Sequence, residues 1–99
     1  MEEHVYYNNL FDCYKELLTD KEKESFSSYY EEDLTLSEIA TNNNISRAAV
    51  HKTVKNVLEK LEDYESTLHL YEIKRDLQDC LKINNLEEKN KRITEIIDK

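Results

Sequence analysis

The complete absence of glycine and proline is the feature that most limits how this chain can fold. Glycine supplies most of the positive-φ positions that tight hairpins and phosphate-binding loops require, and proline marks many turns. A chain without either residue is therefore a poor candidate for a β-hairpin protein or a fold built on glycine-rich loops. Because 36% of its 99 residues are charged, we expect well-solvated helix faces and an all-α fold.

The net charge of −8 is distributed unevenly along the chain. Residues 1–45 carry 11 acidic and 3 basic side chains, whereas residues 46–99 carry 11 of each. No apolar run approaches the roughly 20 residues that a membrane span needs, and the acidic start MEEHVYYNN lacks the apolar core of a signal peptide. We therefore expect a cytoplasmic protein without membrane insertion, in which Cys13 and Cys80 are free thiols.

Apolar residues at intervals of three and four divide the chain into five predicted helices. The predicted ranges are about 3–18, 20–31, 36–42, 46–83 and 86–98. The fourth helix is the longest because an unbroken heptad seam runs through it. This seam consists of Val50, Val54, Val57, Leu61, Tyr64, Leu68 and Tyr71. A single helix of that length would measure about 57 Å, which exceeds the width of so small a core, so a break near Thr67 is the alternative.

Four of these helices begin with a capping signature, the last of which is Asn85 with Glu88 three residues on. Thr19 with Glu22, and Thr35 with Glu38, have the spacing of a capping box, in which a hydroxyl and a carboxylate each accept a backbone N–H. Ser46 is the predicted cap of the fourth helix. The last helix has few apolar residues, and we expect it to bury Leu86, Ile93, Ile96 and Ile97.

Residues 36–55, LSEIATNNNISRAAVHKTVK, have the pattern of a helix-turn-helix, whose second helix can enter the major groove of DNA. Asn42-Asn43-Asn44 forms the predicted turn, because asparagine tolerates the left-handed conformation better than most residues with a Cβ. The two helices must cross closely, and the small side chain of Ala40 lies at the crossing. The predicted motif core is Ile39, Ala40, Ile45, Val50 and Val54.

The outward face of the second motif helix is basic and is a candidate nucleic-acid surface. The predicted contact residues are Ser46, Arg47, Ala48, His51, Lys52 and Lys55. Arginine and lysine pair with phosphate oxygens or with guanine O6 and N7, and free N–H groups at a helix start can hold a phosphate. The alternative is an ordinary solvated face. The acidic chain argues against tight non-specific binding, because nucleic-acid affinity depends on counterions released by basic side chains.

No pattern in the chain indicates an enzyme or a metal protein. His4, His51 and His69 share no metal-ligand spacing, and there is no CxxC pair. A glycine-rich loop, a Ser-His-Asp order and a paired-carboxylate context are also absent from the sequence. We therefore predict a non-enzymatic protein with no metal and no cofactor, whose tyrosines serve mainly in the core and in interfaces.

The lower part of the heptad seam leaves two arrangements open. Either it forms a homodimer interface, or it folds back on the first helix of the same chain. The residues concerned are Val57, Leu61, Tyr64, Leu68 and Tyr71. We accordingly divide the chain into a helix-turn-helix domain over residues 1–66 and a helical extension over residues 67–99, which serves dimerisation or partner binding.

The segment LLTDKEKESFSSYYEEDLTLSEIATNNNISRAAVHKTVKNVLEKLEDYE resembles the fourth, promoter-reading region of bacterial sigma factors. The phrase LEDYESTLHLY, after the ISRAAV helix, is similar to the YlxM-like family, small helix-turn-helix proteins associated with the signal recognition particle. The resemblance covers about residues 7–75. It implies a DNA-binding regulatory protein linked to the signal-recognition-particle pathway, or a protein- or RNA-interaction adaptor of that particle that uses the motif as scaffold.

The same resemblance places the nucleic-acid contacts at the six residues from Ser46 to Lys55 named above. Two positions depart from the usual helix-turn-helix pattern. Asn44 stands where such motifs usually have glycine, and Asn43 stands where they usually bury an apolar side chain. Both departures predict a looser turn.

Overall fold

The computed structural model describes residues 2–99, which fold into six α-helices and two short helical turns. The helices are α1 (Glu2–Tyr14), α2 (Asp20–Phe26), α3 (Leu36–Asn43), α4 (Arg47–Leu68), α5 (Leu70–Cys80) and α6 (Leu86–Ile97). A 3-10 turn, η1 (Lys15–Leu17), follows α1, and a π turn, η2 (Ser27–Glu31), follows α2. The all-α prediction is confirmed, but the predicted five helices are in fact six, because α4 and α5 are separate.

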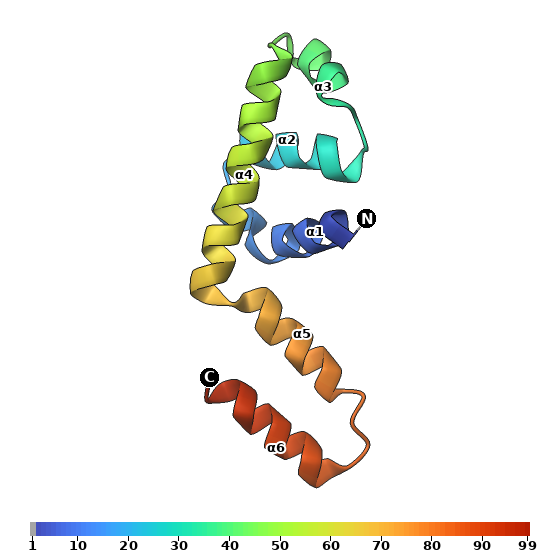
Figure 1. Cartoon of the computed structure of the whole chain (residues 1–99), viewed down its shortest axis with the longest axis vertical. Helices are drawn as coiled ribbons and strands as arrows, with labels where there is room; N and C mark the ends of the chain where they lie inside the picture. The colour runs from blue at the N-terminus through green and yellow to red at the C-terminus, as the bar shows by residue number, and fades with distance from the viewer. Residues whose placement is uncertain (1) are drawn as a thin grey trace.

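Helix α4 is the central helix of the N-terminal part of the molecule (Figure 1). Helices α1, α2 and α3 lie along one side of it, with α3 beside its N-terminal end and α1 nearer its C-terminal end. Their shared core consists of Leu10, Phe11, Tyr14, Leu18, Phe26, Tyr30, Ile39, Ala40, Val50, Val54, Val57 and Leu61. The four residues from α4 recur at intervals of three and four, so one stripe of α4 faces all three helices.

Aromatic rings fill much of the space between α1 and the α2–η2 segment. Phe11 and Phe26 stack with their centroids 4.3 Å apart, and Tyr30 also stacks on Phe26, with centroids 4.8 Å apart. Burial raises the pKa of the Tyr30 phenol to about 12. All seven tyrosines lie in this core or pack against it, which confirms the predicted role of the tyrosines.

The predicted capping boxes fix the starts of α2 and α3. The hydroxyl of Thr19 accepts the Glu22 N–H at 3.1 Å, and the Thr19 N–H donates to the Glu22 carboxylate at 2.9 Å. Thr35 and Glu38 repeat both bonds at the start of α3. The Glu22 carboxylate also lies 2.6 Å from the Lys60 ammonium, which joins α2 to α4. A cap of this kind stabilises a helix by about 1 kcal/mol.

A sharp turn at His69 separates α4 from α5. His69 has φ 56° and ψ 27°, the left-handed conformation, and α4 ends at the preceding residue, Leu68. The prediction of one helix from 46 to 83 is therefore wrong, and the alternative break near Thr67 comes within two residues of the observed one. The physical reason is a set of contacts from other parts of the chain to the start of α5.

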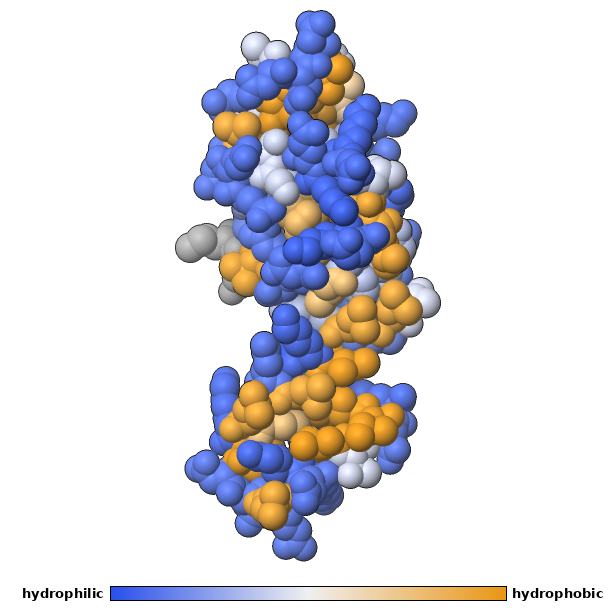
Figure 2. All heavy atoms as spheres, turned by 180° about the vertical axis from the view of Figure 1, so that it is seen from behind, coloured by the Kyte–Doolittle hydropathy of each residue, from blue (hydrophilic) through white to orange (hydrophobic). Residues whose placement is uncertain are grey.

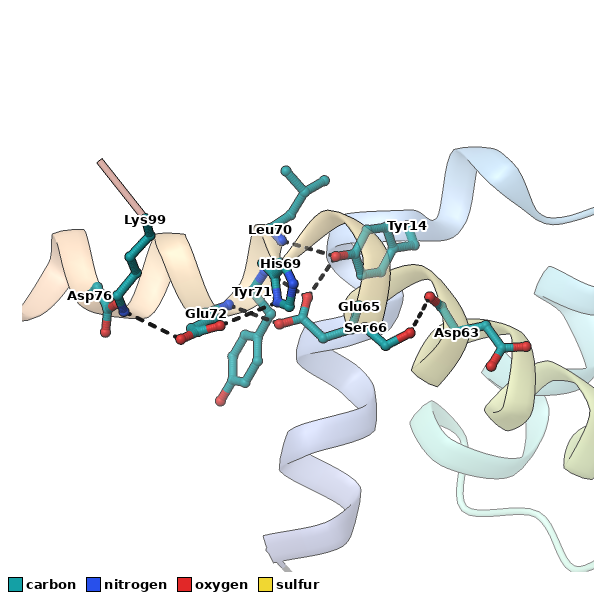
Figure 3. Close-up of polar contacts among 10 residues, drawn as sticks. All are labelled: Tyr14, Asp63, Glu65, Ser66, His69, Leu70, Tyr71, Glu72, Asp76 and Lys99. Atoms are coloured by element: carbon teal, nitrogen blue, oxygen red, sulfur yellow. Dashed lines mark hydrogen bonds and ion pairs between the residues drawn. The ribbon is translucent and has the colours of Figure 1, made fainter. Parts of the chain in front are cut away.

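Tyr14 and Glu65 together cap the N-terminus of α5 (Figure 3). The Leu70 N–H donates to the Tyr14 hydroxyl at 3.0 Å, and the N–H groups of Tyr71 and Glu72 donate to the two carboxylate oxygens of Glu65 at 3.0 and 3.1 Å. The first N–H groups of a helix have no partner inside the helix. These two side chains therefore make a helix start possible directly after His69, where no local cap residue exists.

Helices α5 and α6 form an antiparallel hairpin beyond the C-terminal end of α4 (Figure 1). Within the described part of this hairpin the buried side chains are Asp76, Cys80 and Ile96. The Asp76 carboxylate lies 2.9 Å from the Lys99 ammonium, whose hydrogen bond holds the pKa of Asp76 below its usual range. The molecule measures 58 × 23 × 18 Å, and its radius of gyration of 17.3 Å exceeds the roughly 13 Å of a compact domain of this length.

The predicted burial of the last helix is only partly correct. Ile96 is buried and Ile93 is half-buried, but Leu86 and Ile97 are 72% and 74% exposed. The reason is that α6 packs on α5, so one side of the hairpin is left uncovered. The prediction for the cysteines is confirmed, since Cys13 and Cys80 are both free thiols.

Candidate nucleic-acid interface

The helix-turn-helix is formed by α3 and the first turns of α4. Asn44 ends α3 with φ 54° and ψ 44°, so asparagine takes the left-handed position that glycine usually occupies. The Ile45 N–H then donates to the Ala40 carbonyl at 3.0 Å, which closes the end of α3. Ser46 starts α4, and its hydroxyl accepts the Ala49 N–H at 3.0 Å, as predicted for a cap. The turn is closed and hydrogen-bonded in spite of its lack of glycine.

Four of the five predicted motif-core residues are buried between the two helices. These are Ile39, Ala40, Val50 and Val54, with exposed fractions of 2% to 7%. Ile45 is the exception, because 41% of it remains exposed and its prediction as a core residue is wrong. Ile45 lies in the turn itself, at the edge of a hollow that it shares with Asn43, and no residue of the described range 2–99 covers its outer side.

All six predicted contact residues lie on the surface. Ser46, Arg47, Ala48, His51, Lys52 and Lys55 are each exposed. The spacing of four between Arg47, His51 and Lys55 places them on one stripe of α4, and Lys52 lies on the neighbouring stripe. The N-terminal end of α4 is also at one extremity of the molecule, beside α3 (Figure 1).

The basic side chains of this end of α4 are not neutralised by neighbours. Among the ion pairs between residues 2 and 99, none includes Arg47, Lys52 or Lys55. Lys60, further along α4, forms an ion pair with Glu22 at 2.6 Å, so its charge is neutralised within the chain. No acidic residue occurs in α4 before position 59. The three cations are therefore available to an external anion.

The family comparison agrees with this geometry. A family model described as "UPF0122: Putative helix-turn-helix protein, YlxM / p13 like" matches residues 1–99. The chain belongs to the UPF0122 family. The resemblance to YlxM-like proteins, inferred from the motif and the phrase that follows it, is confirmed. The UPF0122 description gives a structural motif and no enzymatic activity.

Individual UPF0122 relatives match most of the chain. A UPF0122 protein of Fusobacterium nucleatum is 41% identical over 78 residues, which cover 79% of this chain and 76% of the relative. One of Malacoplasma penetrans is 41% identical over 80 residues, covering 78% and 75%. One of Mycoplasma capricolum is 41% identical over 95 residues, covering 91% and 84%. The aligned lengths are those of a shared fold and not of a short shared motif.

Two shallow hollows border the basic stripe of this UPF0122 chain, and the sequence did not predict them. One, of about 350 Å³, is lined by His4, Tyr29 and Arg47 among others. The adjoining one, of about 170 Å³, also includes Tyr29 and is bordered by His51 and Lys55. The hollows form where η2 meets α4, whereas the sequence predicted only that the tyrosines serve mainly in the core and in interfaces. No local sequence signal identifies such a contact between distant segments.

The residues considered for an oligomer interface divide between the core and the surface. Val57 and Leu61 are fully buried inside the chain, and both belong to the shared core. Tyr64 and Tyr71 are half-buried, with the ring of Tyr64 5.7 Å from that of Tyr14 and the ring of Tyr71 5.7 Å from that of Tyr6. Leu68 alone of the five is exposed, at 46%. Four of the five residues therefore pack against other parts of the same chain.

Residues 2–99 hold neither a cluster of metal-ligating side chains nor a membrane-spanning helix. No three histidine, cysteine or acidic side chains in this part of the chain come together as a metal site would require. None of its helices combines the length and apolar character of a membrane span.

Proposed function

We propose that this UPF0122 chain is a non-enzymatic nucleic-acid-binding regulatory protein that contacts duplex DNA with the N-terminal half of α4. The observation that carries the proposal is the exposed, unpaired set of Arg47, Lys52 and Lys55 at the start of a helix-turn-helix. In this reading residues 1–66 are the binding domain, and residues 67–99 are an extension with another task.

The positions of the basic side chains around α4 suggest which of them contact phosphates and which contact bases. Arg47 and Lys55 lie on one stripe of α4 and suit the phosphates along one side of the groove, whereas Ala48 and Lys52 lie on the face opposite the core and suit base edges. Lysine pairs with guanine O6 and N7, and His51 adds a hydrogen bond from the groove wall. Ser46 and the adjacent N–H groups at the start of α4 suit one further phosphate.

The acidity of the rest of the chain limits the affinity we expect. The chain carries a net charge of −8, and a duplex is densely negative, so binding must depend on the few cations of α4. Counterion release then makes the affinity steeply dependent on salt. We expect weak general binding and a recognisable preference only for a matched sequence.

A second target, RNA, is supported by the hollow beside the basic stripe. The half-buried ring of Tyr29 and the ring of His4 line this hollow next to Arg47. Aromatic side chains beside cations hold unpaired bases by stacking. This arrangement suits the alternative in which the chain is an adaptor of the signal recognition particle and contacts the RNA of that particle.

The test is a binding assay at low salt with duplex DNA and with the particle RNA in parallel. Arg47→Ala together with Lys52→Ala should weaken binding at least about tenfold. Lys74→Ala together with Lys91→Ala removes the same charge from exposed positions of α5 and α6 and serves as the matched control. Equal losses for both pairs, or no binding by wild type to either nucleic acid, would refute the proposal. A loss of RNA binding alone on Tyr29→Ala would favour the adaptor.

A further inference from the structure

The α5–α6 hairpin carries an apolar face that nothing in the described chain covers. Figure 2 shows it as a continuous hydrophobic area over the lower half of the molecule, seen from behind. The residues that form it are Leu68, Leu70, Ile73, Leu77, Leu81, Leu86 and Ile97, each between 37% and 77% exposed. We call this set the hairpin face.

The hairpin face is organised and is not a scatter of exposed residues. Positions 70, 73, 77 and 81 recur at intervals of three and four, so they form one stripe along α5. Beside this stripe runs a groove of about 470 Å³, lined by Leu68, Ile73, Leu77, Ile96 and Ile97 together with polar residues at its rim. Contiguous apolar surface of this kind marks an interaction site.

The hairpin also lacks a core of its own. Cys80 and Ile96 are its buried apolar residues in the described structure, and the third buried side chain is the carboxylate of Asp76. A pair of helices with so small an interior gains little from the hydrophobic effect, whose strength follows the apolar area buried. A second layer of helices over the hairpin face would supply the missing burial.

The distribution of charge favours a second copy of the chain as this layer. Residues 70–99 hold seven acidic and seven basic side chains and are neutral, whereas residues 1–69 hold 15 acidic and seven basic side chains and carry the whole net charge of −8. A neutral face meets its own copy without net repulsion, and it offers no complement to a strongly charged partner. Glu72 and Lys99 at the groove rim already pair with each other at 3.3 Å within the chain, so this pair adds no net charge that would repel a second copy.

The shape of the face also suits a pair of hairpins. It extends along α5 and α6, which are 11 and 12 residues long, and includes Leu68 at the end of α4. Two antiparallel hairpins stacked on this face make a four-helix bundle, an arrangement in which apolar stripes of facing helices form the core.

We infer that the hairpin face is the interface of a homodimer, in which two α5–α6 hairpins form a four-helix bundle. This interface differs from one through Val57 and Leu61 of α4, because both of these residues are buried in the core of their own chain. It lies at the end of the 58 Å molecule opposite α3 and the start of α4. The candidate nucleic-acid interface of each copy therefore stays uncovered, and the inference holds whether or not the chain binds nucleic acid.

Sedimentation equilibrium of the full chain, from low micromolar to millimolar concentration, tests the inference. Wild type should be a dimer, and Leu81→Glu together with Ile97→Glu should weaken dimerisation by about 100-fold or more, because each places an unpaired charge in the interface. Both residues are over 70% exposed in the single chain, so the variant should keep wild-type helicity by circular dichroism. Val5→Glu together with Leu17→Glu, at exposed apolar positions of α1 and η1, is the matched control and should remain dimeric.

A wild type that stays monomeric at millimolar concentration would overturn the inference and leave the hairpin face to a different protein. So would a dimer that survives Leu81→Glu with Ile97→Glu. Should that variant unfold, amide hydrogen exchange of wild type decides instead: protection in α5 and α6 must rise with concentration while protection in α3 stays constant. Protection independent of concentration would contradict the dimer.

Discussion

The hydroxyl oxygen of Tyr14 lies 2.6 Å from Oε1 of Glu65, 51 residues further along the chain, and donates a hydrogen bond to it. The same oxygen accepts the Leu70 N–H at 3.0 Å. Burial of the phenol and its bond to the Glu65 carboxylate raise the pKa of Tyr14 to about 12, so the hydroxyl keeps its proton at neutral pH. This contact connects α1, the end of α4 and the start of α5, and it fixes where the long helix breaks.

Removal of the Tyr14 hydroxyl should therefore destabilise the fold. Tyr14→Phe leaves the Leu70 N–H without its acceptor and Glu65 without its donor, and we expect the free energy of unfolding to fall by about 1–3 kcal/mol in a urea titration. Tyr64→Phe is the control, since the Tyr64 hydroxyl makes only a 3.4 Å contact with the Leu17 carbonyl. Its effect should stay within about 0.5 kcal/mol. Similar losses for the two variants would mean that ring packing alone matters at Tyr14.

The capping role of Glu65 predicts a coupling between Glu65 and Tyr14. Glu65→Ala frees the N–H groups of Tyr71 and Glu72, so their hydrogen exchange should accelerate relative to wild type. Because the two side chains share one network, the losses from Tyr14→Phe and Glu65→Ala should not add, with a coupling energy of about 0.5–3 kcal/mol. Strict additivity in the double variant would show that they act independently.

Stability should fall in acid because carboxylates with a lowered pKa, Glu22 and Asp76 among them, are held ionised in the fold. The hydrogen bond from Lys60 lowers the pKa of Glu22 from 4.5, and the bond from Lys99 lowers the pKa of Asp76 from 3.8. A lowered folded-state pKa gives stability that is complete above the unfolded-state value and is lost as the pH falls through the folded-state value. The urea midpoint should thus be constant near neutrality and decline below pH 4.5.

The substitution Glu22→Gln distinguishes the contribution of Glu22 to this acid decline from that of the other carboxylates. Glu22→Gln should lower stability at neutral pH and flatten the loss in acid, because the neutral amide does not titrate. Glu59→Gln changes an exposed acid of α4 and is the control, with an acid profile like that of wild type. An unchanged profile for Glu22→Gln would rule out the Glu22–Lys60 pair as a source of the pH dependence.

The left-handed turn residue of the helix-turn-helix makes a further prediction. Asn44 has φ 54°, so Asn44→Ala should lower the free energy of unfolding by about 1 kcal/mol. Asn44→Gly should stay within about 0.5 kcal/mol of wild type, because glycine reaches this conformation freely but loses more entropy on folding. Asn42→Ala, at an exposed position inside α3, is the control and should be neutral or slightly stabilising. If Asn44→Ala left the free energy of unfolding nearly unchanged, the turn would have to adopt another conformation that alanine tolerates.

Local signals allowed much of this fold to be predicted. Thr19, Thr35 and Ser46 each have a side chain that can cap the helix that follows, and all three caps occur in the structure. The break at His69 could not be located in this way, because the acceptors that permit it are Tyr14, a distant residue, and Glu65, a residue of the preceding helix. A heptad pattern reports which residues face one side of a helix, but not where that helix stops.

The candidate site, like the fold, could be predicted only where local spacing decides which residues are exposed. Exposure of Arg47, Lys52 and Lys55 follows from the buried stripe on the opposite side of α4. The exposure of Ile45 does not follow, because it depends on how the turn closes, and neither does the place of Tyr29 beside Arg47. Such positions depend on packing between segments, which no spacing in the sequence encodes.

The most direct test of the proposed function is the salt dependence of duplex binding by wild type. If Arg47 and Lys55 neutralise phosphates while Lys52 contacts a base edge, the logarithm of the association constant should fall against the logarithm of salt with a slope of about −2, since each phosphate contact contributes about −0.9. Arg47→Ala together with Lys52→Ala should reduce that slope by about one, because only Arg47 of the two contacts a phosphate. An absence of binding at low salt, or a slope that these substitutions leave unchanged, would contradict the account.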